Sequence, residues 1–130
     1  MGAWGTGSFE NDDARDWIGK LDTVVPEELT RIFADTANGS NYIEAPEASV
    51  VVAAAEVVAL SNSSSSGVPA GILNWTAENR AAFTTELKGV AVRALERVRR
   101  NSELKDLWLE ADGLNDWIAA IQDLQSRLQG

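Results

Sequence analysis

The sequence predicts an all-α protein, a single compact domain over residues 1–130 with about five to six helices and an ordered, extended N-terminal arm. Apolar residues recur every three or four positions through almost the whole chain, which is the spacing of amphipathic helices. Prolines and small polar residues, which favour helix starts, precede several of these stripes. A chain of 130 residues can bury about two-thirds of its unfolded surface without disulfides or metals.

The first two helices are expected in the first third of the chain. Asn11 or Asp12 can cap the first, because both side chains accept hydrogen bonds from the free amides of a first turn. Its apolar stripe is Ala14, Trp17, Ile18 and Leu21. The second helix begins at Pro26, a residue suited to the first helical position. It ends at Asn38-Gly39, where both residues tolerate a left-handed conformation.

The third helix is expected over residues 46–60 and is apolar on nearly every side, which indicates a central, mostly buried helix. The valines at 50–52 could form a strand, but the alanines that follow them favour a helix. A flexible serine-rich loop is expected over residues 61–67. A long fourth helix should start at a Thr76 cap and run to about residue 99. Two further stripes predict the last helices: Leu104, Leu107, Trp108 and Ala111, then Leu114, Trp117, Ile118, Ile121, Leu124 and Leu128.

Residues 1–9 are expected to form a docked arm near the first helix. Trp4 and Phe9 carry large apolar surfaces that are costly to leave in water. Gly5 and Gly7 allow the backbone to approach its neighbours closely. Trp4 is therefore expected to pack into the domain, and the alternative is that it serves as an exposed anchor for a partner.

Two segments carry a family resemblance. The first is the start of the chain and the acidic stretch after it: Gly2, Ala3, Trp4, Gly5, Phe9, Asn11, Asp12, Ala14, Asp16 and Trp17. The second is the run Ala54, Ala55 and Glu56. In both, the chain resembles the small bacterial proteins of the domain of unknown function 4259 family. The resemblance spans most of the chain, and it implies a bacterial protein without implying an activity.

Composition restricts the possible chemistry. The chain has no cysteine and no histidine, which excludes a thiol nucleophile, a Ser-His-Asp triad and the usual ligands of zinc. Catalysis would have to use carboxylates, lysine, hydroxyls, the single tyrosine or a bound hard cation, and no cofactor is expected. No apolar run is long enough to span a bilayer and no secretion leader is present, so the expected location is the cytoplasm.

The net charge of −9 is unevenly distributed. Residues 1–60 hold eleven acids and three bases, and residues 61–130 hold nine acids and eight bases. An acidic surface repels phosphates, so binding to nucleic acid is not expected, whereas a basic protein partner is. The one basic cluster is Arg93, Arg97, Arg99 and Arg100. These arginines should pair with the acidic half of the chain or lie at a helix C-terminus, and a phosphate or nucleotide site is the alternative.

The densest group of acids is Glu10, Asp12, Asp13 and Asp16. On a helix these carboxylates lie within one turn of each other, so hydration, helix capping, a hard cation or a partner must compensate their repulsion. Glu56 is the other unusual acid, because its helical neighbours are apolar. Three interpretations stay open for Glu56. It can belong to a narrow, solvent-exposed polar stripe of the helix, it can form a buried pair with an arginine or a tryptophan NH, or it can be a functional carboxylate.

Of the five tryptophans, Trp17, Trp108 and Trp117 fall in helical stripes and are expected in the core. Trp4 and Trp75 lie outside the stripes and are the candidates for an exposed surface. The favoured function is a protein-binding module that uses the acidic N-terminal half. The alternative is a carboxylate enzyme, with or without Mg²⁺, built on Glu56 and the acids at 12, 13 and 16. No catalytic residue or metal ligand is assigned.

Overall fold

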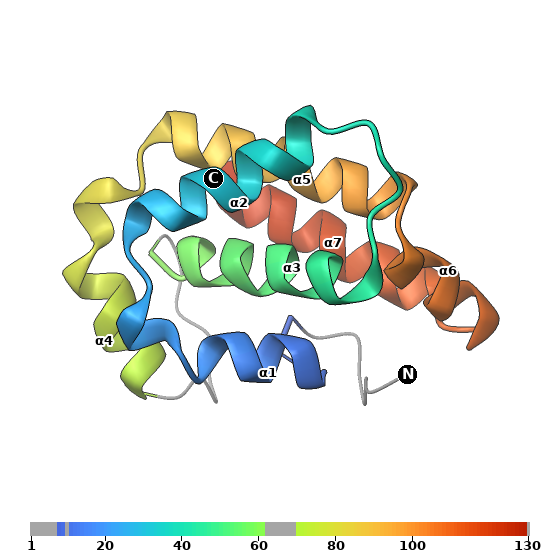
Figure 1. Cartoon of the computed structure of the whole chain (residues 1–130), viewed down its shortest axis with the longest axis horizontal. Coiled ribbons are helices and arrows are strands. Elements are labelled where there is room, and N and C mark those ends of the chain that lie inside the picture. Colours follow the sequence, from blue (N-terminus) through green and yellow to red (C-terminus); the bar gives the residue numbers. More distant parts are fainter. Residues whose placement is uncertain (1–7, 10, 62–69, 130) are drawn as a thin grey trace.

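Helices make up most of the part of the chain that the computed structural model describes, which is residues 8, 9, 11–61 and 70–129 (Figure 1). The fold is all-α, as predicted, but the described residues form seven α-helices rather than five to six. In chain order they are α1 (Asp12–Ile18), α2 (Pro26–Asn38), α3 (Ala45–Ala59), α4 (Ala70–Glu78), α5 (Thr85–Arg100), α6 (Glu103–Glu110) and α7 (Leu114–Gln129). Two short 3-10 helices, Leu21–Thr23 and Arg80–Ala82, join their neighbours.

Helix α3 lies at the centre of the molecule. It contacts each of the other six α-helices, and Figure 1 shows α1 on one side of it and α2 on the other. Ten of its fifteen residues are buried, in keeping with a sequence that is apolar all round. The predicted central helix is therefore confirmed, and the valine run at 50–52 is helical.

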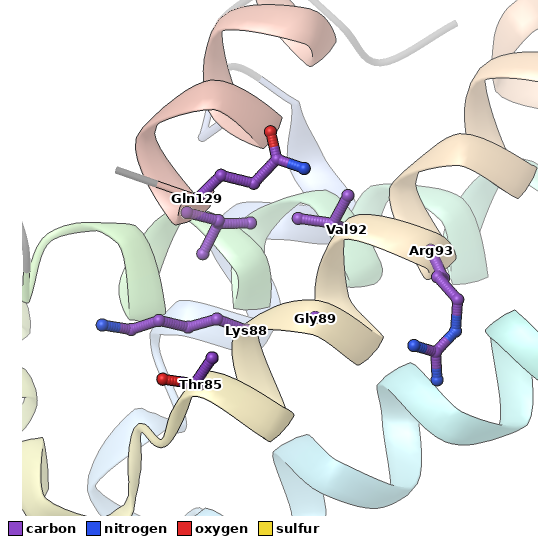
Figure 2. A pocket seen from close by; sticks show the side chains of 7 residues that line it. Thr85, Lys88, Gly89, Val92, Arg93 and Gln129 are labelled. Atoms are coloured by element: carbon purple, nitrogen blue, oxygen red, sulfur yellow. The ribbon is translucent and has the colours of Figure 1, made fainter.

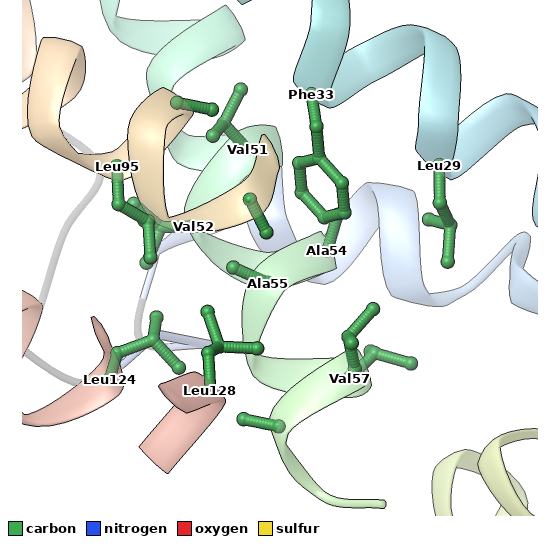
Figure 3. Packing of buried hydrophobic residues seen from close by; sticks show 14 of the residues in the cluster. Leu29, Phe33, Val51, Val52, Ala54, Ala55, Val57, Leu95, Leu124 and Leu128 are labelled. Atoms are coloured by element: carbon green, nitrogen blue, oxygen red, sulfur yellow. The ribbon is translucent and has the colours of Figure 1, made fainter. Parts of the chain in front are cut away.

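Small residues on α3 allow its neighbours to approach closely. Ala54 and Ala55 are fully buried, and Phe33 of α2 points toward the first of them (Figure 3). Leu95 of α5 and Leu124 of α7 close the same cluster from other sides (Figure 3). Each such large side chain contributes about 1.5–3 kcal/mol through burial. This core fixes the helices that carry the candidate site.

The segment before α5 differs from the prediction. Thr76 does not cap a long helix over residues 76–99, because it lies inside the separate helix α4 and is 3% exposed. Its hydroxyl donates to the carbonyl of Val57 at 3.3 Å, so its role is a contact with α3. Helix α5 is capped instead by Thr84, whose side chain accepts a hydrogen bond from the amide of Leu87 at 3.1 Å.

Helix α2 ends at Asn38 as predicted, but for another reason. Gly39 has φ −74° and ψ 162°, which is extended backbone and not the expected left-handed conformation. A Cβ at Gly39 would lie 2.9 Å from the carbonyl oxygen of Asp35 and 3.2 Å from Nη1 of Arg97. There is therefore no room for a side chain at this position. The Arg97 guanidinium cannot move away freely, because it donates a hydrogen bond to the carbonyl of Thr36 at 2.7 Å.

Some predictions fall outside the described residues. They concern residues 1–7 of the arm, including Trp4, and residues 62–67 of the serine-rich loop. At the described end of the arm, Phe9 is half-buried and packs against the core. Among the helices that the structure describes, none combines the length and the apolar character that a membrane span requires.

Candidate functional site

The acids of α1 form an exposed, negatively charged surface. Asp12, Asp13 and Asp16 are exposed, and none of them forms an ion pair with another described residue. Asn11 caps the helix, since its side chain accepts from the amide of Ala14 at 2.8 Å. The aspartates are thus not used for side-chain capping, although those at 12 and 13 also suit the positive end of the helix dipole.

These acids do not assemble into a metal centre within the described residues. No group of three or more histidines, cysteines, aspartates or glutamates there is arranged to hold a metal ion. Glu10, the fourth member of the predicted cluster, lies outside the described residues. The buried Ala14 fixes α1 against α3, so the position of the three charges is set by packing.

Glu56 forms a partly buried pair with an arginine, which agrees best with the paired form among the three interpretations that the sequence left open. Arg127 of α7 donates from Nη1 to Oε2 at 2.5 Å and from Nη2 to Oε1 at 2.8 Å. The hydroxyl of Ser8 donates to Oε1 at 3.0 Å, and the Glu56 side chain is 12% exposed. Hydrogen bonding to Glu56 raises the pKa of Arg127 above its usual range. Both carboxylate oxygens have partners, so nothing in the described part of the chain favours the carboxylate-enzyme alternative.

The expectation that Trp75 is exposed is wrong. Trp75 is 8% exposed, its Nε1 donates to the carbonyl of Val24 at 3.3 Å, and its ring lies 6.0 Å from that of Phe83. Trp75, Ile72 and Thr76 are the buried residues of α4, at the spacing of a helical stripe. This stripe was the missed signal, and it excludes Trp75 as an anchor for a partner.

Three of the four clustered arginines have internal partners. Arg97 meets a helix C-terminus, as predicted, since it donates to the carbonyl of Thr36 in the last turn of α2 and to that of Asn41 beyond it. Arg99 and Arg100 both bind the carboxylate of Glu96 on their own helix, and not an acid of the N-terminal half. The hydrogen bond from Arg99, helped by those from Gln125 and Arg100, lowers the pKa of Glu96 to about 2 despite partial burial. The fourth arginine, at position 93, has no such contact with the described residues.

A groove between α2 and α3 was not predicted from the sequence. Its volume is about 380 Å³, and its apolar surface comes from Ile32, Pro46, Val50 and Val51. The exposed acids Asp35 and Glu47 also line it, and neither forms an ion pair with a described residue. The groove combines apolar and negatively charged surface within the acidic half of the chain. No sequence stripe could reveal it, because the two helices contribute separate parts.

Tyr42 marks a second acidic region, beside α6. Its hydroxyl donates to Oδ2 of Asp106. The loss of this hydrogen bond on ionisation, desolvation, and repulsion by Asp106, Glu103 and Glu110 together raise the pKa of Tyr42 to about 12. The neutral tyrosine is therefore the form that the folded protein favours.

The titration of Tyr42 tests this contact. Phenolate absorbance should show a midpoint near pH 12 in the wild type and a lower midpoint, closer to the ordinary value of 10, in Asp106→Ala. Because the chain has a single tyrosine, the signal belongs to Tyr42 alone. Because the pKa of Tyr42 is higher in the folded protein than in the unfolded chain, the contact stabilises the folded protein. This contribution to stability is fully present below pH 10 and is lost as the pH rises through 12. Circular dichroism should confirm that both proteins stay folded, and coincident titrations would contradict the contact.

Comparisons with known proteins give one match. The model of the family described as "Domain of unknown function (DUF4259)" matches residues 2–120, which include the N-terminal segment and the Ala54-Ala55-Glu56 run. No match to the chain was found among curated proteins or among solved structures. Since the family model covers most of the sequence, the chain belongs to the DUF4259 family.

Proposed function

We propose that this chain is a protein-binding module that holds a basic, amphipathic segment of another protein on its acidic N-terminal half. The groove between α2 and α3 carries the proposal. Its apolar surface offers a place for a hydrophobic side chain of the partner, and Asp35 and Glu47 offer charges for a neighbouring lysine or arginine. Such a combination distinguishes a docking groove from a general acidic surface.

The charge distribution supports the same interpretation. The half of the chain that contains the groove has eleven acids and three bases. An excess of one sign attracts an oppositely charged partner over several ångströms and speeds association, in a manner that salt weakens. Asp12, Asp13 and Asp16 lie on α1, on the other side of α3 from the groove (Figure 1), so they add to this long-range attraction without lining the docking surface.

The partner's apolar contact is assigned to the groove and not to Trp75. Trp75 is buried against Phe83, so it is not available as an anchor. Ile32 and Val50 are half-buried and face the groove, which leaves apolar area for a partner to cover.

A charge-reversal experiment tests the proposal. Tagged wild type and the double variant Asp35→Lys/Glu47→Lys are used to capture proteins from native lysate, at low and at high salt. We expect a basic protein to be retained by the wild type at low salt and lost at high salt, and the double variant to lose about tenfold or more of it. The matched control is Glu78→Lys/Glu110→Lys, which reverses two exposed charges in the other half of the chain.

The control decides whether the groove itself is involved. Retention by the control variant together with loss from the groove variant supports the proposal. Equal loss from both variants would show attraction to net charge alone and would contradict a docking groove. Failure of the wild type to retain any basic protein at low salt would contradict the function as a whole.

A further inference from the structure

A second groove lies between the first half of α5 and the last turn of α7 (Figure 2). Its volume is about 540 Å³, within the range of small-molecule pockets. Val92 and Leu128 provide apolar surface, and Thr85 and Gln129 provide a hydroxyl and an amide. The groove is thus built for a ligand with both polar and apolar parts.

The charge in this groove has the opposite sign to that of the protein. Among the described residues, the groove is lined by Lys88 and Arg93 and by no aspartate or glutamate, in a chain with twenty acids and eleven bases. Figure 2 shows the two cationic side chains extending to opposite sides of α5, with Gly89 between them. Arg93 is the one member of its arginine cluster that makes no hydrogen bond or ion pair with the described residues.

Gly89 is a second, independent observation. It lies inside α5, where glycine lowers helix stability relative to alanine. A Cβ at this position would meet nothing within 4 Å, so no neighbouring atom requires glycine there. The missing side chain does, however, keep the space between Lys88 and Arg93 open.

We propose that the groove between α5 and α7 binds a small organic anion, in which a phosphate or carboxylate group is joined to an apolar body. Arg93 binds the oxyanion, because a guanidinium offers paired donors to two oxygens at once. The apolar body lies over Gly89 against Val92 and Leu128. This site is independent of the docking groove on the acidic half.

Binding of three simple probes tests the proposal by calorimetry and by the shifts of backbone amide signals. The probes are phenyl phosphate, phenylacetate and the neutral phenol. We expect saturable binding of at least one anion at millimolar concentration, with shifts at Thr85, Gly89 and Gln129 and with phenol inactive. Tighter binding of phenyl phosphate would assign the site to phosphate esters, and tighter binding of phenylacetate would assign it to carboxylates.

Matched variants locate the binding. Arg93→Ala should weaken it about tenfold or more, as expected for loss of a charged hydrogen bond. Arg31→Ala removes an exposed arginine of α2 and should change it by less than about twofold. Gly89→Leu should abolish binding by filling the groove, whereas Gly71→Leu, at another helical glycine with open space, should not. Circular dichroism checks that each variant is folded.

Four results would overturn the proposal. One is the absence of saturable binding by either anion. Another is equal weakening by Arg93→Ala and Arg31→Ala, which would mean general charge attraction. The third is binding of phenol as tight as that of the anions. The fourth is unchanged binding of the anions in Gly89→Leu.

Discussion

Phe33→Ala is expected to lower the free energy of unfolding by about 3–5 kcal/mol, the cost of removing a buried aromatic side chain and leaving a cavity. Phe33 is fully buried and is the largest of the side chains with almost no exposure. It joins α2 to the alanines of α3, whose small side chains cannot move in to fill the space (Figure 3). Chemical denaturation of the variant and the wild type measures the difference.

The control for this substitution is Leu109→Ala. Leu109 is 57% exposed, so its truncation should change the free energy of unfolding by less than about 1 kcal/mol. If Phe33→Ala cost no more than this control, α2 would not pack against α3 as described.

Arg127→Met is expected to lower the free energy of unfolding by about 2–3 kcal/mol, because it leaves the Glu56 carboxylate buried with only a hydroxyl partner. The value is below that of a fully buried pair, since the Arg127 side chain is 26% exposed. Ser8 would remain as the hydrogen-bond donor to Glu56. Equilibrium denaturation in urea gives the difference.

Two further variants separate the charge from the packing. Arg31→Met breaks a pair with Glu28 in which the arginine is 67% exposed, and it should cost about 0–1 kcal/mol. The double variant Glu56→Met/Arg127→Met removes both charges and should recover much of the loss, because no unpaired carboxylate remains. A double variant that is less stable than Arg127→Met would show that the ion pair does not act as described.

Local pattern was enough to predict most of the fold. Pro26 and Pro46 both lie in the first turn of a helix, at N1 of α2 and N2 of α3, because a helix start loses nothing from the missing amide hydrogen. The apolar run after Pro46 predicted a buried central helix, and α3 is one. Where the sequence prediction failed, contacts between distant segments decided the structure. Thr76, for example, has the chemistry of a cap, but its hydroxyl binds the carbonyl of Val57 in α3.

The candidate site was less predictable than the fold. The sequence left a paired Glu56 as one of three interpretations, and it could not show which residue would be the partner, because Arg127 lies 71 positions away. Exposure of the aspartates of α1 followed from their helical positions. The two grooves could not be predicted from the sequence, because each is formed by two helices whose relative placement depends on the whole core.

The central position of α3 also has a consequence for synthesis. The chain makes α3 before α5, α6 and α7, three of the helices that cover it. Helices α1 and α2 precede α3 and can pack against it first, whereas the faces that α5, α6 and α7 cover have no native partner until those helices follow. Native packing is completed only when α7 emerges and brings Arg127 to Glu56. The core of this domain is therefore completed only after α7 has been made, and not helix by helix as the chain grows.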